Sequence, residues 1–348
     1  MTHQELPSYD QAPAGALRFN TDSRKLEVYC GGPVGFGTTT ITGAWYQIDS
    51  FTPDTATGGT RGLFVQGYPV AAPSARGNVI DYITISTTGD ALDFGDLSNE
   101  AQQGGAASSS TRGIIVGGYS TQNLNNIDYV TISSTGNAQD FGDLSTARHA
   151  VGGTSNSTRA IFAGGTAPTI INDVDYITIA STGDAKDFGD LLDASRNTYG
   201  CASSTRAVYA GGTTPTVINI IQYFTISTLG NAADFGDYST TRDSTDGCSN
   251  SIRGLFGASF SPGTSNTIEY ITIATLGNSI DFGDRTVTQG YYGSTSSSTR
   301  GVFAGGQPSY TDVIDYVQIM TIGNATDFGN LTIGRSTNSG LSNGHGGL

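Results

Sequence analysis

Residues 152–191 read GGTSNSTRAIFAGGTAPTIINDVDYITIASTGDAKDFGDL and contain one full unit of a pattern that runs through the chain. Short β-branched and aromatic runs alternate with clusters of Gly, Ser, Asn and Asp, and no helical period is present. The unit predicts four strands, A to D, at 151–155, 159–163, 174–180 and 185–191. A hairpin turn is expected at 181–184, where Gly183 can take the positive φ that such turns require.

The same unit recurs six times. The phrase Asp-Phe-Gly-Asp, or a close variant, begins at Asp93, Asp140, Asp187, Asp234, Asp281 and Asp327. An Arg followed by Gly or Ala and an apolar run keeps the same interval, at Arg61, Arg112, Arg159, Arg206, Arg253 and Arg300. The step of about 47 residues, with four antiparallel strands in each, predicts an all-β fold: a six-bladed β-propeller around a central channel.

Both ends of the chain bear on the domain organisation. The first repeat begins abruptly at Thr60, whereas the chain continues past the last repeat into Gly340–Gly344, which resembles a strand A. We therefore expect the C-terminal segment to supply or complete the inner strand of the first blade and so close the ring. The sequence predicts two domains, a β-rich attachment segment at 1–55 and the propeller at 56–348.

The propeller repeats carry a family resemblance. An apolar run that ends in Gly-Gly precedes a loop and an aromatic-bearing strand, and this arrangement resembles the kelch repeat over nearly all of residues 58–348. The glycine pairs are Gly117-Gly118, Gly164-Gly165, Gly211-Gly212 and Gly305-Gly306. The kelch tryptophan at the end of the third strand is absent, and the Phe of the Asp-Phe-Gly step replaces it.

Composition excludes several classes of partner. The net charge is −14 and the only lysines are Lys25 and Lys186, so the chain lacks the basic stripe that nucleic acid or anionic lipid demands. No apolar stretch has the length of a membrane span, and the N-terminus lacks the features of a signal peptide. We expect a soluble protein made in a cytoplasm. Cys201 and Cys248 occupy equivalent places in adjacent repeats and are expected to be small buried thiols on inner strands.

A residue repeated in every blade is first of all structural. We expect the Phe to pack between blades, the Gly to allow close approach, and the Asp residues to accept bonds from turn amides or from arginines. The arginines are those that begin strand B and a second group after strand D. This second group is Arg148, Arg196, Arg242, Arg285 and Arg335. Bidentate Arg–carboxylate pairing is the expected interaction. A Ca²⁺ site built from the repeated Asp residues is an alternative.

Catalysis has little support in the sequence. The only histidines are His3, His149 and His345, so the multi-histidine metal centre of kelch-type copper oxidases cannot be assembled. The Ser-x-Asp-x-Gly-x-Thr-Trp boxes of sialidase propellers are also missing. We interpret His149 as a loop or channel-lining residue, and we expect a protein that is not an enzyme and needs no cofactor.

The repeats differ from one another unevenly. The A–B links and C–D turns hardly change and should share one face of the ring, whereas the B–C loops and D–A links vary strongly and should share the other. Because function concentrates on loops held by a rigid scaffold, the variable face is the candidate binding surface. Its candidate residues are Tyr68, Tyr119, Asn123, Phe260, Tyr310 and Asp312. Such residues suit sugars; drift on an unselected face is the alternative explanation.

The N-terminal segment predicts a β-hairpin, with strands at 17–20 and 26–29. The pattern Gly15-x-Leu-Arg-Phe-Asn-Thr-Asp-x-x-Lys-Leu-Glu-x-Tyr, with Trp45-x-x-Ile after it, resembles a segment common in phage tail-fibre and other virion surface proteins. The resemblance implies a virion structural protein of a tailed phage, attached to other virion proteins through residues 1–50, oligomeric within the virion, and using the propeller for attachment to a host-surface glycan. The alternatives are a capsid decoration or tail scaffold protein without a ligand and, more remotely, an enzyme that acts on polysaccharide.

Overall fold

The computed structural model describes residues 17–20, 25–30, 44–47, 60–70 and 76–348. The chain divides into two compact units, Met1–Ala56 and Thr57–Leu348. The first contains β1 (Leu17–Asn20), β2 (Lys25–Cys30) and β3 (Ala44–Gln47), an antiparallel sheet in the order β1-β2-β3. The hairpin expected from the sequence is present as β1 and β2, and β3 adds a strand beside β2. A third strand helps because an isolated two-stranded hairpin is marginally stable in water.

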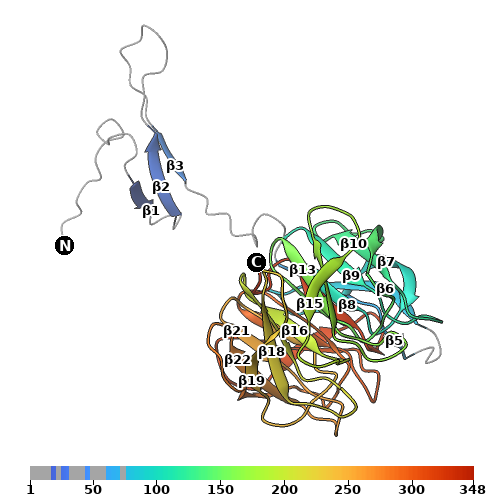
Figure 1. The fold of residues 1–348 in the computed structure, drawn as a ribbon. Coiled ribbons are helices and arrows are strands. Elements are labelled where there is room, and N and C mark those ends of the chain that lie inside the picture. Colours follow the sequence, from blue (N-terminus) through green and yellow to red (C-terminus); the bar gives the residue numbers. More distant parts are fainter. Residues whose placement is uncertain (1–16, 21–24, 31–43, 48–59, 71–75) are drawn as a thin grey trace. The chain divides into compact units, whose positions relative to one another are not determined.

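The second unit is a six-bladed β-propeller whose described residues form strands and no helix (Figure 1). Each blade is a four-stranded antiparallel sheet, and strands A to D run from the axis outward. Blade 1 contains β29 (Ser339–Ser342), β4 (Arg61–Val65), β6 (Gly77–Thr84) and β7 (Leu92–Ala101). Blade 2 contains β8 (Gly105–Ser108), β9 (Arg112–Val116), β10 (Asn126–Thr131) and β11 (Gln139–Asp143). Blade 3 contains β12 (Gly152–Ser155), β13 (Arg159–Ala163), β14 (Asp173–Thr178) and β15 (Lys186–Asp190).

The remaining blades repeat this plan. Blade 4 contains β16 (Tyr199–Ala202), β17 (Arg206–Ala210), β18 (Ile220–Thr225) and β19 (Ala233–Asp237). Blade 5 contains β20 (Gly247–Ser249), β21 (Arg253–Phe256), β22 (Thr267–Thr272) and β23 (Ile280–Asp284). Blade 6 contains β24 (Gly293–Ser296), β25 (Arg300–Ala304), β26 (Val313–Gln318) and β27 (Thr326–Asn330).

The ring is closed by the C-terminal strand, as the sequence predicts. Strand β29 pairs with β4 in the register Ser339↔Val65 to Ser342↔Gly62, so the last strand of the chain is the inner strand of blade 1. A short pair formed by β28 (Arg335–Ser336) and β5 (Tyr68–Pro69) adds a second connection between the two ends of the propeller.

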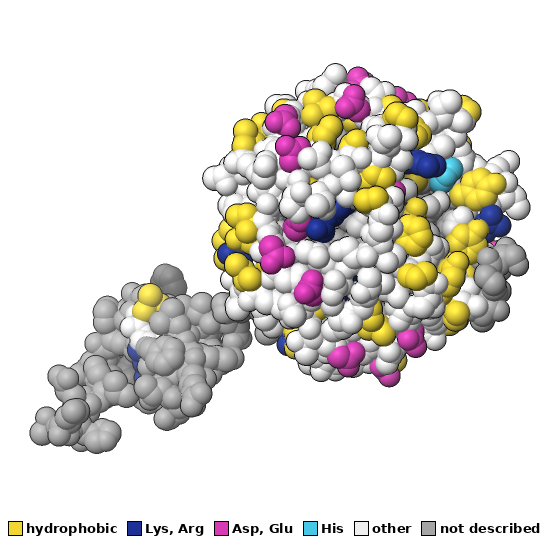
Figure 2. Space-filling model, turned by 90° about the horizontal axis from the view of Figure 1, so that it is seen from below, with side chains coloured by type: hydrophobic (Ala, Val, Ile, Leu, Met, Phe, Trp, Pro, Cys, Tyr) yellow, Lys and Arg dark blue, Asp and Glu magenta, His cyan; other side chains and the backbone are white. Residues whose placement is uncertain are grey.

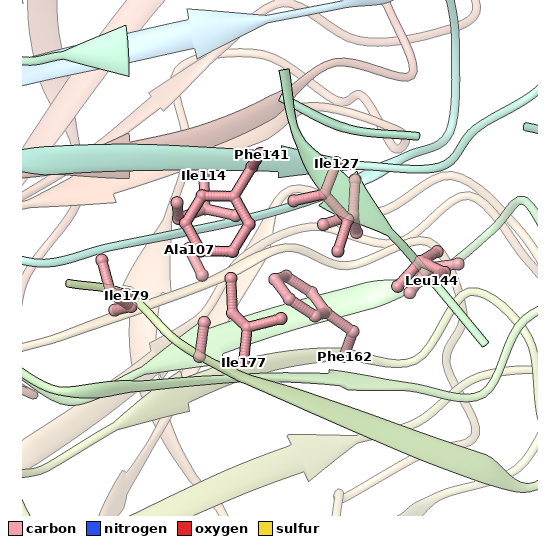
Figure 3. Packing of buried hydrophobic residues seen from close by; sticks show 11 residues of the cluster. Ala107, Ile114, Ile127, Phe141, Leu144, Phe162, Ile177 and Ile179 are labelled. Carbon is pink, nitrogen blue, oxygen red and sulfur yellow. The ribbon is translucent and has the colours of Figure 1, made fainter. Parts of the chain in front are cut away.

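The core lies in layers between the blades. Between blades 2 and 3, Phe141 from β11 packs with Phe162, Ile177 and Ile179 of the next blade (Figure 3). The Phe of the repeated phrase is buried in all six blades, at Phe94, Phe141, Phe188, Phe235, Phe282 and Phe328. Burial of one such side chain is worth about 1.5–3 kcal/mol, so the repeat distributes the stabilising energy evenly around the ring.

The glycine of the repeated phrase is required by a close approach between blades. The turn of blade 3 lies against β11 of blade 2, where the amide of Gly183 donates to the carbonyl of Phe141 at 2.8 Å. A Cβ added at Gly142 would lie 2.6 Å from the backbone of Gly183, and the φ of Gly142 is +149°. Any side chain would therefore force the two blades apart.

The propeller has two different faces, arranged as the sequence predicts. D–A links form backbone bridges to B–C loops, as in Gln102↔Tyr119, His149↔Thr166 and Arg196↔Thr213, so these segments share one face, which we call the loop face. The A–B links and C–D turns share the opposite face, the turn face. There Arg159, next to an A–B link, reaches the carbonyl of Ile226 at the end of strand C in the next blade.

The centre of the ring is almost filled. The inner strands enclose a cavity of about 50 Å³, lined by small residues such as Ala106, Gly153 and Gly200, which leaves room for a few waters at most. The C-terminal tail lies across the inner strands: His345 Nε2 is 3.0 Å from the carbonyl oxygen of Ser108, and the amide of Gly346 donates to the carbonyl of Ser249. Cys201 and Cys248 are buried, free thiols on the inner strands β16 and β20.

Candidate binding site on the loop face

Within the part of the chain that the structure describes, the six arginines that begin strand B do not pair with carboxylates, so that expectation is wrong. Arg159, for example, donates from Nη1 to the carbonyl of Ile226 in the next blade at 2.6 Å, and its guanidinium lies 4.6 Å from the ring centroid of Tyr176. The same two contacts occur in every blade. Each of these arginines stacks on a tyrosine of its own blade and connects to the next blade through a main-chain carbonyl.

Carboxylate pairing does occur for four arginines after strand D. The buried ion pairs are Arg148–Asp175, Arg242–Glu269, Arg285–Asp315 and Arg335–Asp81, at 2.7–3.1 Å. Each acceptor lies in strand C of the next blade and not in the Asp-Phe-Gly phrase. Among the described residues Arg196 forms no such pair, since it lies one position further along its link, in the place of His149; the counterpart of Arg148 there is Ser195, and the equivalent acceptor in blade 4 is the neutral Gln222.

In the described structure, the first Asp of each repeated phrase does not accept the hydrogen bonds from turn amides or arginines that the sequence led us to expect. All six, Asp93, Asp140, Asp187, Asp234, Asp281 and Asp327, are exposed, and within the described residues none of their carboxylates accepts a hydrogen bond. They lie on the outer strand of each blade, where a charge discourages edge-to-edge pairing with another chain. Across the described part of the chain, no group of three or more His, Cys, Asp or Glu side chains is placed to hold a metal ion.

A closed ring of six backbone hydrogen bonds surrounds the axis on the loop face. In each D–A link one amide donates to the carbonyl of the equivalent residue in the preceding blade, at 2.6–3.4 Å. These residues are Gln103, Ala150, Asn197, Ser244, Tyr291 and Thr337, and all have φ between 53° and 59°. Positive φ is costly for residues with side chains and often marks functional positions. The ring therefore fixes the residues beside it.

The position just before each ring residue departs from the repeat. It is occupied by Gln102, His149, Arg196, Asp243, Gly290 and Ser336 in successive blades. The backbone is the same in each case, since five of these residues bridge to the neighbouring B–C loop and Ser336 pairs with Tyr68. Identical backbone with six different side chains means that the fold does not dictate the residue here. Three consecutive blades place a histidine, an arginine and an aspartate around the axis.

His149 is held in one tautomer by its neighbour. Asn123 donates from Nδ2 to the carbonyls of Thr166 and Ala167, which orients its Oδ1 toward His149 Nδ1 at 2.8 Å. Nδ1 therefore carries the proton, and Nε2 is left as an acceptor to which no described residue donates. Burial, and then the charge of Arg196, lower the pKa of His149 below its usual value. The ring is thus neutral at neutral pH.

Aromatic rings and a second arginine extend the site outward. Tyr119 meets His149 edge to face at a centroid distance of 5.5 Å. The guanidinium of Arg76 lies 5.1 Å from the ring of Tyr119 and 5.8 Å from that of Tyr68. All of these side chains are partly exposed. Tyr68, Tyr119 and His149 thus form an aromatic surface, with the guanidinium of Arg76 against the two tyrosines.

On the other side of Arg196 lies a group of buried polar atoms without partners. Asp243 accepts a hydrogen bond from Thr213 through Oδ2, whereas its Oδ1 is unpaired, as are Ser244 Oγ and Asn197 Oδ1. Burial raises the pKa of Asp243. Tyr291 packs beside this group against Phe260, at a centroid distance of 5.1 Å. Buried polar atoms are normally paired, so this concentration marks a place for water or a ligand.

The structure assembles part of the predicted set. Tyr68, Tyr119 and Asn123 are brought together around His149, and Phe260 lies with Tyr291. Tyr310 and Asp312 are on the B–C loop of blade 6, and no side-chain contact joins them to the described residues of that cluster. The residues missed by sequence reasoning are Arg76, Arg196, Asp243 and Tyr291. Comparison of equivalent positions in the D–A links would have revealed Arg196 and Asp243.

Figure 2 shows a propeller face with a few basic side chains, scattered acidic groups and hydrophobic side chains among the remaining surface. No protein-family model matches the chain, and a search of curated proteins found no significant relative. In the described part of the chain, no helix has the length and apolar character needed to cross a membrane.

Proposed function

We propose that this protein is a virion surface protein of tail-fibre or tail-tip type, whose propeller binds a host-surface glycan through its loop face and catalyses no reaction. The carrying observation is the D–A position that places His149, Arg196 and Asp243 around the axis on an otherwise repeated backbone. The other repeated residues are explained by packing between blades. At this position the backbone alone is repeated, and the side chains of three consecutive blades are polar or charged.

The arrangement suits a sugar. His149 Nε2 offers an acceptor, Arg196 offers donors, and Tyr119 and Tyr68 offer apolar ring surface beside them. Sugars present both hydroxyl groups and apolar C–H faces, so such a mixed surface can bind them without a deep cavity. The virion assignment is supported by the resemblance of residues 15–48 to tail-fibre segments. It places the N-terminal segment in contact with other virion proteins and makes the propeller the outward module.

A glycan array with the purified protein tests the proposal. We expect a restricted set of glycans to be bound, and we expect the variants Tyr119→Ala and His149→Ala to lose that binding at least tenfold, because each removes one element of the surface. Asp187→Asn, on the outer strand of blade 3, is the matched control and should bind as the parent does. Binding that survives both loop-face variants would contradict the proposal.

A second candidate, a decoration or scaffold protein without a ligand, is favoured by the turn face. Blades 4, 5 and 6 place Leu229, Leu276 and Ile322 in the C–D turn, each 57% exposed, where blades 1, 2 and 3 have threonine. Met320 and Ile280 lie close to these turns in the sequence and are also exposed. A one-sided set of apolar side chains is a feature of protein interaction surfaces. In this case the turn face would bind the particle.

A further inference from the structure

The arginines of the propeller separate into two classes by what their guanidinium groups contact. Ten of those described donate to main-chain carbonyls or to buried carboxylates, as the six Ile carbonyl contacts and four ion pairs show. Within the described residues, only Arg76 and Arg196 of the propeller have no hydrogen-bonded partner for the guanidinium. Both lie on the loop face.

These two arginines flank the same pair of rings. Arg76 lies against Tyr119, Tyr119 meets His149, and His149 is close enough to Arg196 for that charge to lower its pKa. The Nε atom of each arginine is buried without a partner, whereas the terminal nitrogens are not among the buried unpaired atoms. In each guanidinium the Nε atom is thus buried, whereas the outer nitrogens are open to solvent.

The presence of two unpaired arginines close together is unusual in a chain of this charge. The chain carries a net charge of −14, yet two unpaired cations lie beside a neutral histidine. The pKa of Asp243 is raised by burial and lowered in part by the charge of Arg196, yet among the described residues the two side chains do not form an ion pair. Arginine binds carboxylates with paired, charge-assisted hydrogen bonds, so free guanidinium groups beside aromatic rings favour a ligand that has both an anion and an apolar ring face.

We propose that the loop face recognises a carboxylate-bearing sugar, with Arg196 and Arg76 as the groups that bind the acid. This inference rests on the proposed function and narrows it from glycans in general to acidic glycans. His149 Nε2 accepts a hydrogen bond from a sugar hydroxyl, and Asn123 holds the imidazole ring in place. Tyr119 packs against the sugar ring between the two cations. No covalent step is involved.

Isothermal titration of the full-length protein tests this with matched ligands. Sialyllactose and trigalacturonate serve as acids, and lactose and galactotriose serve as their neutral counterparts, with inorganic phosphate as a test of charge alone. We expect at least one acid to bind ten times or more tightly than its counterpart and phosphate. Arg196→Gln and Arg76→Gln should each weaken that binding about tenfold, consistent with loss of a charge-assisted hydrogen bond. Arg196→Lys should weaken it less, since the charge remains.

Lys186→Gln is the matched control, because it removes one positive charge from the exposed end of β15, away from the loop face, and should leave the affinity unchanged. Thermal unfolding of each variant confirms that it is folded. Equal affinity for acid and neutral sugars, with both lost in Tyr119→Ala, would overturn the acidic-sugar inference and leave the proposed function intact. Phosphate binding as tight as the acids would also overturn it. No binding of any sugar here, together with an empty glycan array, would overturn both proposals.

Discussion

At the scale of single residues, repetition is a reliable guide to packing and a poor guide to polar partners. Phe141 and Gly142 were predictable as structural because the same types recur in all six blades. The partner of Arg112 was not, since the carbonyl that it contacts lies 67 residues further along, in the next blade. Spacing within one repeat cannot reveal an acceptor that belongs to another. The first Asp of the phrase was misassigned for a different reason: its carboxylate is exposed on the outer strand and has no partner among the described residues.

The buried ion pair between Arg148 and Asp175 gives a prediction at this scale. Blade 4 replaces the pair with Ser195 and Gln222, whose Oε1 accepts the amide of Leu192. We expect Arg148→Ser alone to cost about 3–5 kcal/mol of unfolding free energy, because it leaves the Asp175 carboxylate buried without a cation. Adding Asp175→Gln should recover a clear part of that loss.

Chemical denaturation of the two single variants and the double variant measures the coupling. Lys186→Gln is a suitable surface control. A double variant that loses the sum of the two single losses would show that the pair contributes no specific interaction.

At the scale of elements, strand pattern and turn chemistry predicted almost everything about the blades. Strand B at Arg159–Ala163 and the return of β29 to blade 1 follow from alternation and from the unfinished first repeat. The backbone ring through Asn197 and Ser244 was not predictable. It depends on positive φ values at residues whose side chains do not signal them, and on bonds between blades.

The C-terminal tail provides the second prediction. Burial lowers the pKa of His345, whose Nδ1 accepts the amide of Gly347 while Nε2 faces the carbonyl of Ser108. The unfolded pKa is about 6.5, so the folded chain binds the proton less readily. This contribution to stability is therefore full above about pH 6.5 and is lost as the pH falls below that value. His345→Gln should flatten the decline in melting temperature between pH 7 and pH 5.

The control for this experiment is Lys186→Gln, which changes an exposed side chain outside the tail. Asp246 has the opposite sign, since burial raises its pKa to about 7 and its contribution is lost as the pH rises. Asp246 is present in the parent and in every variant, so its contribution cancels when their melting temperatures are compared at the same pH. Parallel melting curves for the parent and His345→Gln at every pH would contradict the assignment.

At the scale of the whole molecule, the two faces of the propeller differ in how much of each blade is repeated. The turn face repeats its links and turns and connects neighbouring blades through arginines such as Arg159. The loop face repeats only its backbone and varies its side chains at the axis. Sequence comparison between repeats predicted which face varies, because loop length and composition are visible there. It did not predict which residues converge, since convergence around an axis depends on how six separate segments meet.

The orientation of the propeller on purified particles tests the central claim, that the loop face is the free, ligand-binding face of a virion protein. Electron microscopy at a resolution that separates the two faces is the measurement. We expect the propeller at the tail, with Arg196 and Tyr119 directed away from the particle and the N-terminal segment toward it. A loop face buried against the particle, a uniform capsid coat, or absence of the protein from particles would contradict the account.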